Sequence, residues 1–208
     1  MVHTPNQKIA NSQVRLTILA IQEVIGEKKF FDILQNLNLA QDLTSLPPDD
    51  LVYELPAEDY AKFIESIGST YGSTGPEILE RIGRASFHQV LREQPGWLSF
   101  ARGTMGLWSP KRRVELILDA IIDSQHTLYP HTNAWIEIKN GQTSYIEQNC
   151  MECYQRQSTE PVCHLKKGFI KESIHWATGL NFNCVETACL ASGDPYCSFS
   201  IGKSSANL

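Results

Sequence analysis

Hydrophobic residues recur at helical spacing through most of the first 128 residues. From Asn11 or Ser12, either of which is suited to cap a helix, to Gly26 the chain is apolar on almost every side. Such a pattern favours a core helix or one in a subunit interface. A second helix is expected from Lys28 to Leu39, before Pro47-Pro48 breaks the chain. The polar residues 1–12 are expected to be mobile.

Three further helices follow from the same periodicity. One begins after Pro56 with an acidic first turn and ends near Gly72. The next runs from Pro76 to Pro95-Gly96, since proline suits the first turn of a helix and Pro-Gly its end. The third begins at Ser109-Pro110. The N-terminal half is therefore predicted to be helical.

The period changes to two after residue 132. Residues 133–139 alternate, Asn140-Gly141 is a strong hairpin signal, and residues 143–150 return as a partner strand. A helix from Pro161 to Thr178 and a second hairpin over 181–201 follow. The pattern predicts an α/β (α+β) fold in which helices pack on one face of an antiparallel sheet of two hairpins.

Composition narrows the class of protein. The chain has 208 residues, of which 42% are hydrophobic, enough for a substantial core. A net charge of -5 argues against direct nucleic-acid binding, and the basic cluster Lys111 to Arg113 is expected to be a solvated helix start. With no signal peptide or membrane-spanning run apparent, a cytoplasmic location is expected. In that compartment cysteines serve in metal binding or burial more often than in disulfides.

Four of the six cysteines lie between Pro161 and Lys203. A hairpin there would bring Cys189 and Cys197 together, within reach of Cys163 on the preceding helix and of Glu186. Three thiolates and a carboxylate would complete a closed, structural zinc shell. Residues three apart in a regular strand face opposite ways, so Glu186 and Cys189 could share an ion only across a bulge. On spacing alone, a metal site, a redox pair and buried thiols all remain open.

The pair Cys150 and Cys153 offers a second candidate. It could be redox-active, form another metal site, or join Cys189 and Cys197 in a rival four-cysteine zinc site. Because the pair does not open a helix after a strand, a thioredoxin-like role is not favoured. Cys184 is expected to be a core residue.

The C-terminal motifs resemble the 4-vinyl reductase domain family. They are Pro-Val-Cys163, Gly179, Glu186-x-x-Cys189 and Gly-Asp-Pro-x-Cys197, followed by Phe-x-Ile-Gly. The resemblance covers residues 75–203 and is specific over 161–202. It implies a zinc ion held by Cys163, Glu186, Cys189 and Cys197. It also implies a fold similar to trafficking-complex subunits and haem-nitric-oxide-binding sensors, usually dimeric, with a pocket for a small apolar molecule.

This resemblance suggests a division of the chain and a ligand site. Residues 1–74 would form an N-terminal helical extension and a candidate dimer interface, and residues 75–203 a ligand-binding domain. Aromatic residues that could line the pocket, or simply pack in the core, are Trp97, Phe100, Trp108, Trp135 and Trp176.

The favoured function is a zinc-stabilised binding or sensor domain. Its ligand would be a small hydrophobic or aromatic molecule, a tetrapyrrole among the candidates, and its output would pass through a protein partner. No phosphate loop, nucleophile elbow or metalloprotease motif is recognisable, so an enzyme is not favoured. The photosynthetic branch of the family suggests one alternative, an accessory factor or enzyme of chlorophyll metabolism and photosystem assembly, peripheral to a photosynthetic membrane. Another is a tethering subunit without ligand.

Overall fold

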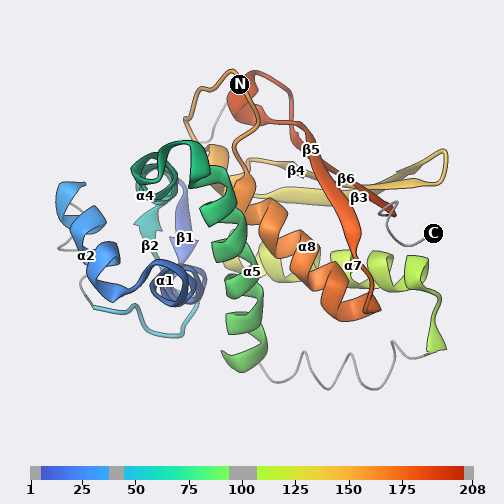
Figure 1. Ribbon diagram of the computed structural model, residues 1–208, viewed down its shortest axis with the longest axis horizontal. Coiled ribbons are helices and arrows are strands. Elements are labelled where there is room, and N and C mark those ends of the chain that lie inside the picture. Colours follow the sequence, from blue (N-terminus) through green and yellow to red (C-terminus); the bar gives the residue numbers. More distant parts are fainter. Residues whose placement is uncertain (1–5, 38–44, 94–106, 204–208) are drawn as a thin grey trace.

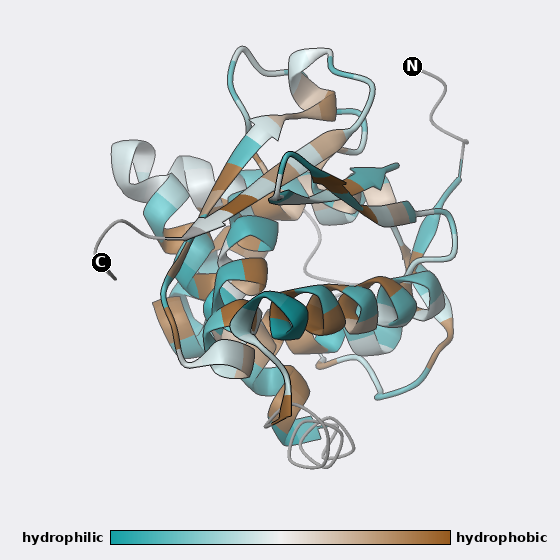
Figure 2. Cartoon of the chain, turned by 90° about the vertical axis from the view of Figure 1, so that its right-hand side faces the viewer, coloured by the Kyte–Doolittle hydropathy of each residue, from teal (hydrophilic) through white to brown (hydrophobic). Residues whose placement is uncertain are grey.

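The computed structural model describes residues 6–37, 45–93 and 107–203. Figure 1 shows helices packed beneath one face of a four-stranded sheet, with a group of N-terminal helices beside them. In Figure 2 hydrophobic and hydrophilic segments alternate along these helices, as expected of amphipathic elements that each cover a core with one side. The predicted α+β class is confirmed.

The N-terminal segment is ordered by a small sheet that the sequence did not predict. Strand β1 (Lys8–Ala10) pairs antiparallel with β2 (Tyr53–Pro56). Ile9 and Ala10 are fully buried, which explains why the expectation of mobility is wrong for residues 8–10. The strand leads directly into α1 (Asn11–Ile25), so Ala10 precedes the helix.

The expected side-chain cap of α1 is also wrong. Ala10 makes no capping bond, and the Ser12 hydroxyl instead donates to the carbonyl of Asp50 at 2.7 Å. The helix ends as predicted at Gly26, whose φ of 83° suits glycine. Helices α2 (Glu27–Asn36) and α4 (Ala57–Thr70) complete this part of the molecule. The apolar face of α1 is buried in the core, as its pattern indicated.

Two long helices support the sheet and a third joins them to the N-terminal part. After a short turn, η1 (Gly72–Thr74), helix α5 (Gly75–Glu93) packs closely on α8 (His164–Thr178). Helix α7 (Pro110–Leu128) begins at Ser109, whose hydroxyl accepts the N–H of Arg112 as the sequence predicted. Gly179 ends α8 in the left-handed conformation.

The main sheet joins the two predicted hairpins. The strands are β3 (Asn133–Lys139), β4 (Gln142–Gln148), β5 (Phe182–Ala188) and β6 (Cys197–Lys203), in the order β3-β4-β6-β5 and antiparallel throughout. Short 3-10 turns η3 (Met151–Cys153) and η4 (Leu190–Ser192) follow β4 and β5. Because these turns lie at the same end of the sheet as the start of α8, their cysteines can meet.

The buried apolar residues form two clusters. One joins the N-terminal helices to Leu79, Ile82 and Ala85 of α5, and the other fills the space between α7, α8 and the sheet. The first cluster crosses the expected boundary between residues 74 and 75. The division into two units therefore stays a prediction. Within the described ranges, no helix has the length and apolar character required to span a bilayer.

Candidate metal centre and ligand cavity

Five of the six cysteines converge at one end of the sheet. Cys150 follows β4, Cys153 ends η3, Cys163 precedes α8, Cys189 follows β5 and Cys197 begins β6. All five are buried. Strand pairing brings Cys197 opposite Glu147, next to the end of β4, while the packing of α8 brings Cys163 alongside. Segments that are far apart in the sequence thus supply one cluster.

A bulge in β5 supplies the reorientation that the sequence required of Glu186. The pairing register with β6 shifts between Glu186 and Ala188. This extra residue lets Glu186 and Cys189 turn to the same side. The carboxylate oxygen Oε2 of Glu186 accepts the backbone N–H of Cys163 at 3.0 Å, while Oε1 is buried with no hydrogen-bond partner.

Two sets of four donors have the separations that a metal ion requires. They are Cys163, Glu186, Cys189 and Cys197, and Cys150, Cys153, Cys163 and Cys197; within each set the donor atoms lie within 4.8 Å of one another. The first is the set that the resemblance implies. The second differs from the expected rival because Cys163 stands in the place of Cys189. Either set offers the sulfur and oxygen donors that suit zinc.

The electrostatics of the cluster also favour a cation. Burial raises the pKa of the Cys163 thiol, and it raises the pKa of Glu186 to about 9, with the Cys189 sulfur acting in the same direction. Contacts with neighbouring thiols lower the pKa of Cys189. A divalent ion would relieve the repulsion between buried thiolates and satisfy the free oxygen of Glu186.

Cys184 lies outside this cluster. Its side chain is 1% exposed and packs in the apolar core beneath the sheet, where burial raises its pKa to about 12. It is the core residue that its sequence position suggested.

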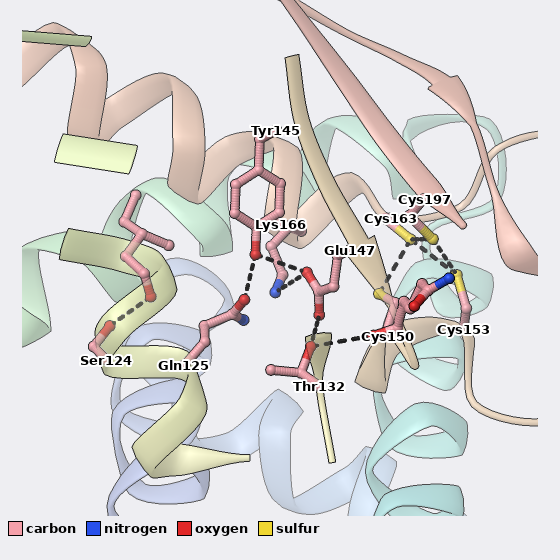
Figure 3. Close-up of polar contacts among 12 residues, drawn as sticks. Ser124, Gln125, Thr132, Tyr145, Glu147, Cys150, Cys153, Cys163, Lys166 and Cys197 are labelled. Carbon is pink, nitrogen blue, oxygen red and sulfur yellow. Dashed lines mark hydrogen bonds and ion pairs between the residues drawn. The ribbon is translucent and has the colours of Figure 1, made fainter. Parts of the chain in front are cut away.

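A buried ion pair lies beside the cysteines (Figure 3). The ammonium of Lys166 on α8 is 2.8 Å from Oε2 of Glu147 on β4, and the two side chains are 6% and 0% exposed. The Thr132 hydroxyl donates to Oε1 of Glu147 at 3.2 Å, and the Tyr145 hydroxyl donates to Oε2 at 3.0 Å. Burial alone would lower the pKa of Lys166, but Glu147 and Tyr145 raise it well above its usual value. The lysine is therefore charged.

A small cavity of ≈ 50 Å³ lies between the helices, next to this pair. Its lining is apolar with a few polar groups, and comprises Gln13, Leu16, Tyr60, Ser86, Val90, Ile121, Ser124, Gln125, Leu128, Met151, Glu152, Leu165, Lys166 and Phe169. Ser86 Oγ and Glu152 Oε2 are buried there without a hydrogen-bond partner. A surface hollow of ≈ 390 Å³ shares Ser124 and Leu128 with the cavity and so lies beside it.

The structure does not place the predicted aromatic residues around this cavity. Trp97 and Phe100 lie outside the described residues. Trp108 is 50% exposed, Trp135 packs edge-on against Tyr196, and Trp176 packs against Phe87. None of these three tryptophans lines the cavity. A role for them in ligand binding stays a prediction.

Sequence reasoning missed the ion pair and the polar cavity wall. One signal was present: Glu147 shares the inward side of β4 with Tyr145 and Thr143, where a charged residue is unusual. Lys166 likewise interrupts the buried face of α8. No pattern identifies Ser86 or Glu152, because their exposure to the cavity depends on how distant helices pack.

Comparison with solved structures places the fold among H-NOX proteins. An H-NOX protein from K. algicida, Fe(II) unliganded, has a TM-score of 0.61 at 10% identity, over 94% of this chain and 97% of that chain. An H-NOX protein from S. oneidensis in the Fe(II)NO state has a TM-score of 0.56 at 11% identity, over 90% and 97%. At this identity the likeness establishes the fold alone.

Residues 145–203 match the family model of the 4-vinyl reductase domain. The match confirms the predicted resemblance over those residues, which contain the whole cysteine cluster. A search of curated proteins finds no significant match.

Haem, which is described for the H-NOX family, does not fit the described cavity. A cavity of ≈ 50 Å³ is far below the roughly 300–1,000 Å³ of pockets for drug-sized ligands, and no histidine is among its lining residues. The cysteine cluster, by contrast, has the donors and separations for a single ion.

Proposed function

We propose that this protein is a sensor or binding domain for a small hydrophobic or aromatic molecule, stabilised by zinc. The observation that carries the proposal is the cavity beside the cysteine cluster, into which two buried polar atoms, Ser86 Oγ and Glu152 Oε2, project without a partner. Buried polar groups of this kind are normally satisfied by water or a ligand. An apolar lining with few polar groups is typical of ligand sites.

The size of the cavity favours a small ligand. With ≈ 50 Å³ it suits a ligand of a few heavy atoms, up to a single ring if the helices adjust, with a hydrogen-bonding group facing Ser86 or Glu152. A tetrapyrrole would require the helices to separate. The surface hollow bordered by Ser124 and Leu128 offers a route of entry.

The proposed zinc ion would bind Cys163, Cys189 and Cys197, with Glu186 as the fourth donor that the resemblance implies. Four protein donors leave no open position for a catalytic water, so the ion would be structural. It would join α8 to the β5–β6 hairpin, and its binding energy would add to folding energy. Met151 and Glu152 line the cavity between Cys150 and Cys153, so the state of the cluster bears on the ligand site.

Signal output would pass through a protein partner, with a homodimer as the working assembly. Leu107 and Trp108 are exposed apolar residues before α7 and offer a contact for such a partner. Helix α7 also borders the cavity, so a ligand there would act directly on the helix.

Thermal unfolding with small probes tests the proposal. Phenol and toluene serve as monocyclic ligands and protoporphyrin IX as a tetrapyrrole. We expect phenol to raise the melting temperature, protoporphyrin to leave it unchanged, and Ser86→Ala to reduce the phenol effect. Ser173→Ala is the matched control, because Ser173 is equally buried but donates within its own helix. No shift with either monocyclic probe, together with no small molecule in mass spectra of the purified protein, would refute a ligand site.

A further inference from the structure

The sulfur of Cys153 lies at the centre of the cysteine cluster. It is 2.9 Å from Cys163, 3.4 Å from Cys189 and 3.5 Å from Cys197, as measured between Sγ atoms. Cys163 in turn lies 3.7 Å from Cys197 and 4.0 Å from Cys189. Each of these four residues is at most 1% exposed.

These distances match the edges of one tetrahedral thiolate shell. A zinc–sulfur bond of about 2.3 Å gives sulfur–sulfur edges of about 3.8 Å in a tetrahedron. Four of the five distances among Cys153, Cys163, Cys189 and Cys197 are within about 0.4 Å of that edge, and only the 2.9 Å contact is shorter. Iron–sulfur clusters would hold cysteines on different irons farther apart, so the spacing favours a single ion.

Glu186 already has a different role in this arrangement. Its Oε2 accepts the N–H of Cys163 at 3.0 Å, which is the position of a carboxylate that orients a ligand residue from outside the shell. Thiolate is also the softer donor and is favoured in closed structural zinc sites. With Cys153 excluded from the shell, its sulfur would remain pressed against three thiolates with no cation between them.

We propose that Cys153 is the fourth ligand of the zinc ion, in place of Glu186, so that four thiolates hold the metal. This inference rests on the proposed function only in assuming that zinc binds the cluster. Cys150, which lies 3.7 Å from Cys163, is a fifth thiol outside the shell.

The assignment gives the metal a direct hold on the ligand cavity. Cys153 ends η3, and the two residues before it, Met151 and Glu152, line the cavity wall. A shell of Cys163, Glu186, Cys189 and Cys197 would leave this segment unattached. With Cys153 as a ligand, the ion fixes α8, η3 and the β5–β6 hairpin together.

X-ray absorption spectroscopy of the zinc-loaded full chain tests the assignment. We expect four sulfur neighbours near about 2.3 Å in the wild type and in Glu186→Gln, and three sulfurs with one oxygen or nitrogen in Cys153→Ser. Zinc affinity, measured by competition with a chromogenic chelator, should fall at least about 10-fold in Cys153→Ser. Cys184→Ser is the control for replacing a buried cysteine, and Cys150→Ser should keep four sulfurs.

The outcomes separate this inference from the function on which it rests. A wild-type shell of three sulfurs and one oxygen that changes in Glu186→Gln but not in Cys153→Ser would overturn the role of Cys153 while leaving the zinc site intact. A wild-type protein that takes up no zinc would overturn both.

Discussion

Gly83 is the position where a single methyl group should do most damage. A Cβ atom there would lie 1.9 Å from the carbonyl oxygen of Leu165 and 2.8 Å from the backbone nitrogen of Phe169. Gly168 faces the carbonyl of Glu80 in the same way, at 2.0 Å. The two glycines let α5 and α8 approach at backbone distance. Because the obstructing atoms are backbone atoms, Gly83→Ala requires the helices to move apart.

The expected loss of stability follows from two opposing effects. Overpacking a core typically destabilises by about 1–3 kcal/mol, and a clash with backbone lies at the upper end or beyond. Alanine in place of glycine favours the helix by about 1 kcal/mol. We therefore expect Gly83→Ala to lower the free energy of unfolding by about 2 kcal/mol. With a urea m-value of about 2 kcal/mol/M, the midpoint falls by about 1 M.

Gly68→Ala in α4 provides the matched control. Its Cβ would meet only the Leu79 side chain, with Cδ1 nearest at 3.0 Å, and that side chain can rotate away. The control should therefore be neutral or slightly stabilising. Equal urea midpoints for Gly83→Ala and Gly68→Ala would refute the idea that backbone contact between α5 and α8 holds this part of the molecule together.

Three further predictions concern charge and metal. Lys166→Met should lower the free energy of unfolding by about 3–5 kcal/mol because it leaves Glu147 buried and unpaired, and adding Glu147→Gln should restore part of the loss; a loss below about 1 kcal/mol in urea titrations would contradict this. Ion pairs with Lys167 and Lys171 lower the pKa of Glu80 despite its burial, so its contribution is present above pH 4.5 and lost as pH falls. Glu80→Gln should thus cost up to about 1 kcal/mol at about pH 7 and nothing near about pH 3, whereas an equal loss at both would exclude the ion pairs as its cause. Removing zinc with a chelator should lower the melting temperature of wild type and Cys184→Ser alike, and Cys189→Ser should respond little, since it has lost a ligand; an unchanged wild type would contradict the metal clasp.

Local sequence determined the elements and their ends. The 3.6-residue period predicted the helices, Asn140-Gly141 marked the first hairpin, and Gly26 and Gly179 marked helix ends. These signals are readable because they depend on φ, ψ and on which side of an element is apolar, both set by neighbouring residues. The need for a bulge between Glu186 and Cys189 could also be stated from the sequence, since it follows from strand geometry alone.

Tertiary packing decided which distant groups meet. Cys153 reaches Cys163, Cys189 and Cys197 only because η3, α8 and the β5–β6 hairpin end at the same edge of the sheet. The pairing of Lys166 with Glu147 and the cavity beside it depend on how closely α8 lies to the sheet and to α5. Periodicity shows which side of an element is buried but not what it is buried against. The sequence therefore determined the parts of this protein and its stock of metal donors, while the packing of those parts decided the cluster and the cavity.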